Sequence, residues 1–164
     1  MKALSWLAVG ILAVSLKSAQ GVAFHIDPHR PSWVEAFYLA RGLPRSIAHA
    51  ISQACVFHVR MENRSQAPIH VRVERWRIKA LGKERPVKGR KAWDALLKEA
   101  PKAARASFYW TLFPDDIILQ PGEGIMGIAI FDLPPGTPFS LTVSWQEDGE
   151  DVALSLSDLR CPTS

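Results

Sequence analysis

The sequence has few of the residues and patterns that mark the common enzyme classes. Two cysteines and two tyrosines occur among 164 residues, and the cysteines do not form a Cys-x-x-Cys pair. The chain contains no Gly-x-Ser-x-Gly elbow, no phosphate-binding glycine loop and no His-Glu-x-x-His motif. These absences argue against the redox, hydrolase, nucleotide-binding and metallopeptidase classes that depend on such motifs. We therefore expect a protein without enzymatic activity.

A hydrophobic run long enough for a membrane-spanning helix is also missing from the N-terminal region. The apolar run over residues 3–16 has 14 residues, whereas a span needs about 18 or more. It follows Lys2 and precedes small residues, which is typical of a secretory signal peptide. We expect residues 1–21 to be a signal peptide, cleaved after Gly21 or after Ala23, and a periplasmic or secreted mature protein. No cysteine directly follows the run, so a lipid anchor is not expected; an uncleaved membrane anchor is the alternative.

The two cysteines, Cys55 and Cys161, most simply form one disulfide in an exported protein. Closing a loop of roughly 100 residues stabilises a fold by at most about 4–5 kcal/mol in the chain-entropy model. A redox or metal-binding thiol pair is the alternative, and the missing Cys-x-x-Cys motif disfavours it. We predict a structural disulfide that ties the first strand after the helices to the C-terminus.

Charge is distributed unevenly along the chain. Residues 60–105 contain 14 Lys and Arg against 5 Asp and Glu, whereas residues 106–160 contain 1 against 9. We favour an arrangement in which the two stretches neutralise each other on adjoining strands, because surfaces of mixed sign are normal. The alternative is a basic surface that contacts anionic lipid or an acidic envelope protein. That surface would consist of Arg72, Arg75, Arg77, Lys79, Lys83 and Arg85. Nucleic acid is not an expected partner of an exported protein.

Helical periodicity dominates the first part of the mature chain, residues 22–54. After a short extended lead, residues 32–43 and 44–54 each place apolar side chains at helical spacing. Ser32 and Glu35 have the spacing of a capping box at the start of the first helix. The pattern predicts a helical hairpin that packs on a sheet.

From Cys55 onward the apolar residues alternate with polar ones, which is the period of a strand. Residues 55–76 predict a hairpin of two strands with a polar turn, and a change of phase near Arg75 indicates a β-bulge. A short helix is expected over 91–100. Turns rich in Pro, Gly and Asp separate five further expected strands, over residues 107–113, 116–120, 124–133, 138–146 and 152–159.

Together these elements predict a mainly β protein. We expect an immunoglobulin-like antiparallel β-sandwich of about seven strands over residues 55–164. The N-terminal helical hairpin and one short inserted helix complete the fold, and all of them form a single domain.

The turn spacing of the C-terminal third, LQPGE…MGIAIFDLPPG…LTVSW…DG, resembles that of known proteins. It is similar to the closing strands of uncharacterised exported bacterial sandwich domains, and to those of periplasmic copper chaperones with a cupredoxin-like sandwich. The resemblance implies a β-sandwich fold. Of the His and Met ligands of the chaperones, only Met126 has a counterpart, because Gly124 and Ile125 stand before it and the adjacent histidine is absent. The resemblance therefore does not carry a copper site to this chain.

Three residues near the mature N-terminus are the first candidates for metal binding. His25, Asp27 and His29 would lie on one face of an extended strand, about 6.5–7 Å apart from one to the next. His and carboxylate donors suit copper or zinc. The alternative is an ordinary strand or tail without a ligand.

Weaker metal candidates are His58, His70 and Met126. The two histidines would share a metal ion only if they lay directly opposite each other in the expected hairpin, and a shift of one residue in register would remove that site. Four arginines around this hairpin would oppose a bound cation. We prefer a solvated face for these histidines.

The sequence thus predicts a non-enzymatic binding or accessory module for another, unknown envelope protein, without a cofactor. The alternative function is periplasmic binding of copper or zinc. The oligomeric state and the identity of the partner do not follow from the sequence.

Overall fold

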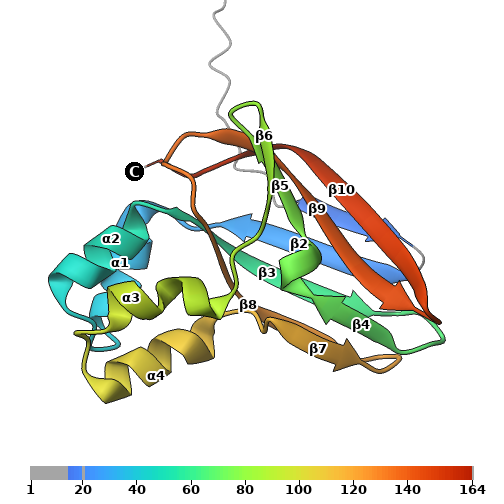
Figure 1. The fold of residues 1–164 in the computed structure, drawn as a ribbon, viewed down its shortest axis with the longest axis horizontal. Coiled ribbons are helices and arrows are strands. Elements are labelled where there is room, and N and C mark those ends of the chain that lie inside the picture. Colours follow the sequence, from blue (N-terminus) through green and yellow to red (C-terminus); the bar gives the residue numbers. More distant parts are fainter. Residues whose placement is uncertain (1–14, 20, 164) are drawn as a thin grey trace, which may run out of the picture.

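The computed structural model of the protein describes residues 15–19 and 21–163, and it consists mainly of two antiparallel sheets (Figure 1). Sheet A has the strand order β1-β2-β3-β8, with β1 Ser15–Ala19, β2 Val22–Pro28, β3 Cys55–Asn63 and β8 Gly124–Phe131. Sheet B has the order β6-β5-β9-β4-β7, and β10 pairs with the other edge of β9. Its strands are β4 Ile69–Arg72, β5 Arg77–Ala80, β6 Lys83–Pro86, β7 Asp116–Leu119, β9 Pro138–Glu147 and β10 Glu150–Arg160. The expected β-sandwich is confirmed.

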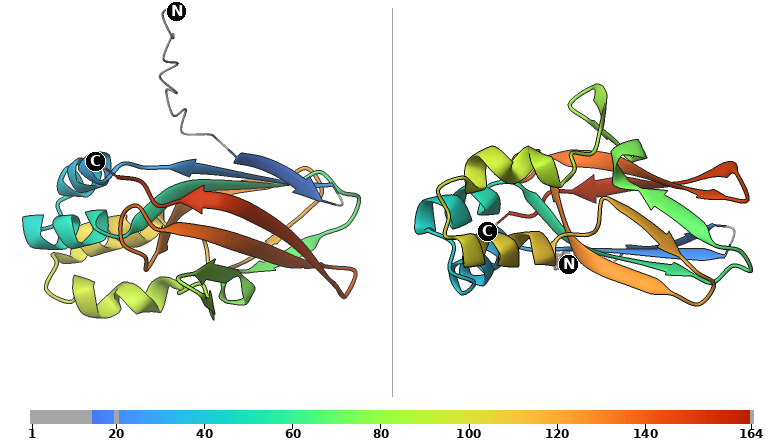
Figure 2. Two further views of the ribbon diagram at one scale, coloured as in Figure 1. Left: turned by 90° about the horizontal axis from the view of Figure 1, so that it is seen from above. Right: turned by 60° about the horizontal axis from the view of Figure 1, so that its bottom comes forward.

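The helices gather at one end of the sandwich (Figures 1 and 2). They are α1 Pro31–Leu39, α2 Arg45–Ser52, α3 Asp94–Leu97 and α4 Lys102–Thr111, with 3-10 turns η1 Val73–Arg75 and η2 Arg90–Trp93. Their buried side chains pack with Val56, Ile128 and Ile130, which belong to β3 and β8. A helical layer therefore covers part of the outer face of sheet A and leaves the rest of that face open.

Alternation along the strands produces the larger core between the two sheets. Every second residue of β3, from Cys55 to Met61, points inward and meets the inward side chains of sheet B. The disulfide between Cys55 and Cys161, with the Cα atoms 5.0 Å apart, joins the start of β3 to the chain after β10. The predicted disulfide is thus confirmed, and it links sheet A to the end of sheet B.

The predicted hairpin over residues 55–76 is wrong. Strand β3 pairs with β2 and β8, whereas β4 pairs with β7 and β9, so the two strands lie in different sheets. The buried side chain of Asn63 explains the crossing. Its amide group donates to the carbonyl groups of Ala67 (2.8 Å) and Leu119 (2.9 Å), and its Oδ1 accepts from Ser65. These bonds hold the connection as a crossover between sheets in place of a hairpin turn.

Three local predictions also differ from the structure. The strand expected over 107–113 lies mostly in α4, because the alanine-rich segment before it favours a helix that begins after Pro101. The expected bulge near Arg75 is the turn η1. The capping box of Ser32 does not form, since Pro31 already occupies the first turn and the helix begins one residue earlier.

The expected signal peptide lies largely outside the described residues, which omit 1–14 and 20. The described part of this segment, β1, pairs with the edge of β2. Cleavage of the signal peptide remains a prediction. Val22 is fully buried, so cleavage after Gly21 would keep this core residue, whereas cleavage after Ala23 would remove it. Among the residues that the structure describes, no helix has the length and hydrophobicity to cross a membrane.

Candidate functional site

The outer face of sheet A has a hollow of about 420 Å³ where the helical layer ends. Its walls come from the segment after β2, from α1, β3 and β8, and from the C-terminal end of α4. The lining residues are His29, Trp33, Phe37, His58, Thr111, Met126, Gly127 and Ile128. The hollow therefore brings together segments that are far apart in the sequence, and most of its lining is aromatic or apolar.

One wall of the hollow is a column of stacked side chains at four-residue spacing. The His29 ring stacks on Trp33 with ring centres 3.9 Å apart, and Trp33 stacks on Phe37 at 4.5 Å. The guanidinium group of Arg41 lies 3.5 Å from the centre of the Phe37 ring and ends the column. Trp33 and Phe37 lie four residues apart in α1 and therefore share one side of the helix. His29 precedes the helix and Arg41 follows it, and their side chains extend the column at its two ends.

Two histidines and a methionine meet on this face. The ring centres of His29 and His58 are 6.2 Å apart. In the register of β3 and β8, His58 lies opposite Ile128 and Arg60 lies opposite Met126. Met126 is thus a diagonal neighbour of His58 on the outer face, within reach of a long side chain.

The electrostatic surroundings keep His29 in its neutral form near neutral pH. Burial lowers the pKa of His29 below its usual value, and the neighbouring His58 lowers it further, whereas Asp27 acts in the opposite direction. Asp27 lies opposite His58 in the register of β2 and β3. The hollow therefore offers an unprotonated imidazole for binding.

Gly127 allows the floor of the hollow to form. A Cβ atom at this position would lie 2.4 Å from the backbone nitrogen of Phe113, which donates to the Ile128 carbonyl at 3.0 Å. The chain after α4 therefore lies directly on β8. Thr111, next in this wall, donates to the Phe108 carbonyl at 2.6 Å and accepts from the Tyr38 hydroxyl at 2.8 Å. Its hydroxyl is already engaged on both sides.

The predicted ligand set His25, Asp27 and His29 is only partly reflected in this arrangement. His25 lies opposite Arg60 and does not line the hollow. Within residues 15–19 and 21–163, no three His, Cys, Asp or Glu side chains are close enough to hold a metal ion. The structure instead groups His29, from the first candidate set, with two of the weaker candidates, His58 and Met126. Metal binding stays a prediction.

Sequence reasoning missed the aromatic members of the site. Trp33 and Phe37 were expected only as apolar residues of a packed helix, yet Trp33 is 42% exposed. The repeat of His29, Trp33, Phe37 and Arg41 at intervals of four residues was the available signal. The closeness of Met126 depends on strand pairing and had no local signal.

His70 lies apart from this site, on sheet B. Its Nε2 is 2.6 Å from Oδ1 of Asp116 and 3.3 Å from Nε of Arg72. His58 and His70 therefore do not share a metal ion, because their strands, β3 and β4, belong to different sheets.

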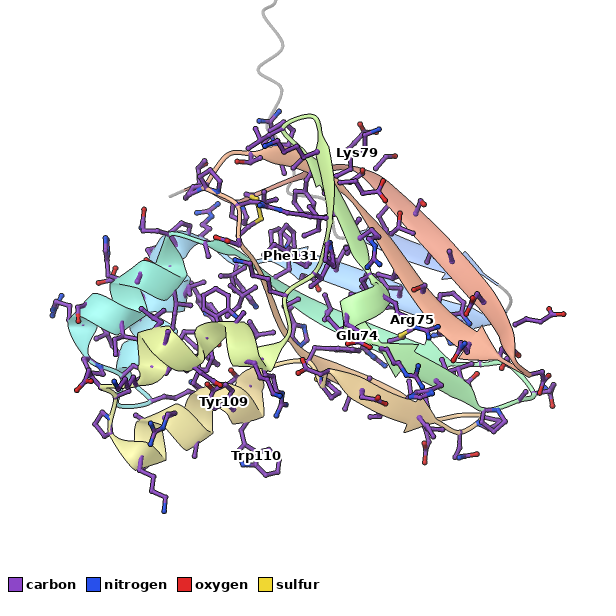
Figure 3. All side chains as sticks on the ribbon, viewed as in Figure 1. Glu74, Arg75, Lys79, Tyr109, Trp110 and Phe131 are labelled. Atoms are coloured by element: carbon purple, nitrogen blue, oxygen red, sulfur yellow. A yellow bond between two sulfur atoms is a disulfide. The ribbon has the colours of Figure 1, made fainter. Side chains whose placement is uncertain are left out.

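The predicted basic surface is distributed along sheet B. Arg72, Arg75 and Arg77 line a groove of about 360 Å³ that His70 and Asp151 also line, and Arg75 projects from η1 beside β9 (Figure 3). The remaining members, Lys79, Lys83 and Arg85, continue along β5 and β6. Acidic residues from the C-terminal stretch pair with basic residues of the central stretch: Asp116 with Arg72, Asp132 with Lys88, and Asp151 with Arg75. This pairing agrees with the expected neutralisation.

No family model and no curated protein matches the chain. Among solved structures, "a putative lipoprotein (ycdA)" from Bacillus subtilis is similar with a TM-score of 0.49 and 11% identity. The similarity covers 89% of this chain but 39% of that one, so this chain spans well under half of the length of the Bacillus protein. A DUF4426 family protein from Pseudomonas aeruginosa is similar with a TM-score of 0.42, 14% identity, and coverage of 91% and 94%. Neither similarity assigns a function to this chain.

Proposed function

We propose that the protein is a non-enzymatic accessory module of the cell envelope, and that the hollow on sheet A is the surface through which it binds another envelope protein. The exposure of large apolar side chains around a concave site carries this proposal. Trp33 is 42% exposed and Met126 is 56% exposed, and both line the hollow with Phe37. Aromatic residues and methionine are enriched at the centres of protein interfaces, where they fill pockets of the partner.

The surroundings of the hollow support binding in preference to catalysis. Its single hydroxyl group among the lining residues, that of Thr111, is held by Tyr38 and by the Phe108 carbonyl. The imidazoles of His29 and His58 could act as bases, but the one hydroxyl of the lining already donates its proton to the Phe108 carbonyl, so no free nucleophile stands beside them in the lining. A binding role requires only the shape and the exposed apolar surface.

The disulfide supports a location outside the cytoplasm, because structural disulfides persist in oxidising compartments. The expected signal peptide points the same way. We place the protein in the periplasm or the secreted fraction, where its partner would be another exported protein.

Site-specific photo-crosslinking in the native host tests this function. A benzophenone amino acid replaces Trp33 in one variant and Ile118 in a matched control. Ile118 is 55% exposed but belongs to β7 of sheet B, away from the hollow. We expect one envelope protein to be crosslinked from position 33 and not from position 118. The further change Phe37→Ala should lower the yield at position 33. Equal adducts from both positions, or none from position 33, would contradict the proposal.

A further inference from the structure

The spacing of the two histidine rings suits a shared metal ion. An imidazole nitrogen binds a metal ion at about 2.0–2.1 Å, so two rings on one ion have their centres about 5–6.5 Å apart, with the larger value for donors on opposite sides of the ion. The centres of His29 and His58 are 6.2 Å apart. This separation is at the upper part of that range, which two nitrogen donors reach when they lie on nearly opposite sides of an ion.

The third side chain selects the kind of metal. Thioether sulfur is a soft donor that favours Cu(I), whereas Zn²⁺ prefers additional nitrogen, thiolate or carboxylate ligands. Met126 lines the same hollow as the two histidines and is 56% exposed. The described residues provide no group of three His, Cys, Asp or Glu side chains for a zinc site. The donor set is therefore one for a soft monovalent ion.

The supporting groups around the three donors keep them available. Trp33 holds the His29 ring in place by stacking. Arg60, which lies opposite Met126 in register, forms an ion pair with Glu62. The positive charge nearest to the methionine is thus partly compensated, which reduces the repulsion of a bound cation.

We propose that His29, His58 and Met126 bind one Cu(I) ion in the hollow. This site rests on the proposed function in one respect: it uses the same hollow that we propose as the surface for the partner protein. Three donors in a hollow that is open to solvent leave one side of the ion free. A donor from a partner protein could enter there, so the accessory module would hold the ion at the surface where its partner docks.

An anaerobic Cu(I) titration in competition with a chromophoric Cu(I) chelator tests the proposal on the mature protein. We expect one equivalent of Cu(I) to bind and to quench part of the tryptophan fluorescence, since Trp33 stacks on the His29 ring. His58→Ala should weaken binding by at least ~10-fold, the usual scale for changes to metal-site residues. His29→Phe keeps an aromatic ring on Trp33 but removes both nitrogens, and it should weaken binding similarly. His70→Ala and His49→Ala, which lie outside the hollow, should leave the affinity unchanged.

Met126→Leu tests the softness of the site, because it keeps the volume and removes the sulfur. It should lower the affinity for Cu(I) and leave any weak binding of Zn²⁺ unchanged. The proposal would be overturned by the absence of Cu(I) binding tighter than micromolar. It would also be overturned if the hollow variants bound Cu(I) as tightly as the unchanged protein, or if His70→Ala reduced binding equally.

The result is separable from the test of the proposed function. His58→Ala leaves Phe37 and Met126 in place, so crosslinking from the benzophenone at position 33 in this variant reports on the partner alone. Crosslinking without Cu(I) binding would overturn the copper site and keep the accessory role. Cu(I) binding without any crosslink would support the copper site and remove the protein partner.

Discussion

Similar sequence features have different surroundings on the outer faces of the two sheets. His58 and His70 both stand at polar positions of alternating strands, 12 residues apart. On sheet A, His58 lines an aromatic hollow near His29 and Met126. On sheet B, His70 contacts Asp116 at 2.6 Å and lies in a groove lined by arginines.

The difference shows that the neighbours across the sheet decide the chemistry of a polar strand position. On sheet A the helical layer ends beside the histidine and places aromatic rings next to it. On sheet B the acidic residues of β7 and β10 compensate the arginines. We propose the first face as a binding surface for apolar groups or a soft metal ion, whereas the second has paired charges of both signs.

Removing the covalent link between the sheets should have the largest effect, since both faces depend on the sandwich. In the double variant Cys55→Ala and Cys161→Ala, we expect the free energy of unfolding to fall by about 2–5 kcal/mol, because the disulfide closes a long loop across 106 residues. Urea denaturation of the variant measures the loss. The unchanged protein in reducing agent serves as the control and should lose a similar amount. A loss below about 1 kcal/mol would mean that packing alone joins the sheets.

Gly127→Ala adds a single methyl group and should disturb the packing of the floor of the hollow. The added Cβ would lie 2.4 Å from the Phe113 nitrogen, so the chain after α4 has to move. We expect a loss of about 1–3 kcal/mol in the free energy of unfolding, together with weaker crosslinking from position 33. Gly124→Ala on the same strand is the matched control, because its nearest contacts are at 3.3 Å. If the control lost as much, the close approach of Phe113 would not be the cause.

Replacing one exposed apolar residue on each face should show on which face such a side chain stabilises the fold. Trp33→Ala breaks two stacked contacts, each worth about 0.5–1.5 kcal/mol beyond burial. We therefore expect a loss of about 1–2 kcal/mol by thermal or urea unfolding. Ile118→Ala on sheet B should stay within about 0.5 kcal/mol, as is usual for exposed positions. Equal losses would mean that the column does not stabilise the fold.

The sequence predicted those parts of the molecule that depend on local patterns. Alternation identified β3, β8, β9 and β10, and the two cysteines, in a chain expected to be exported, indicated the disulfide. Turn residues such as Pro121-Gly122 separated the strands correctly. The strands and turns were predicted correctly because residues close together in the chain determine them. The disulfide was predicted correctly because two cysteines allow only one pairing.

The candidate site could not be predicted in the same way. The parity of β3 placed His58 on an outer face, but the pairing of β3 with β2 and β8 was needed to bring His29 and Met126 beside it. The expected hairpin failed because the buried side chain of Asn63 holds a crossover between sheets. The strand expected at the end of α4 failed because aromatic residues also pack on helices when alanines precede them.

Lowering the pH should weaken the fold through His29 on sheet A. Burial and the neighbouring His58 lower the pKa of His29 below 6.5 in the folded protein, so the unfolded chain binds the proton more readily. The stabilising contribution is complete above pH 6.5 and decreases as the pH falls from 6.5 to the lowered pKa of the folded state. We expect His29→Phe to reduce this part of the pH dependence of the unfolding free energy. An unchanged pH profile in the variant would contradict the assignment to His29.

The ion pair between Arg75 and Asp151 on sheet B should have the smallest effect of all. The two groups are 3.5 Å apart, and their side chains are 43% and 76% exposed. Exposed pairs of this kind contribute about 0–1 kcal/mol and are screened by salt. We expect Asp151→Asn to change the free energy of unfolding by less than about 0.5 kcal/mol, with no change at high salt. The groove would nevertheless become more basic. If the variant then bound vesicles of anionic lipid that the unchanged protein ignores, the acidic residues of sheet B would be what keeps this face from acting as a binding surface.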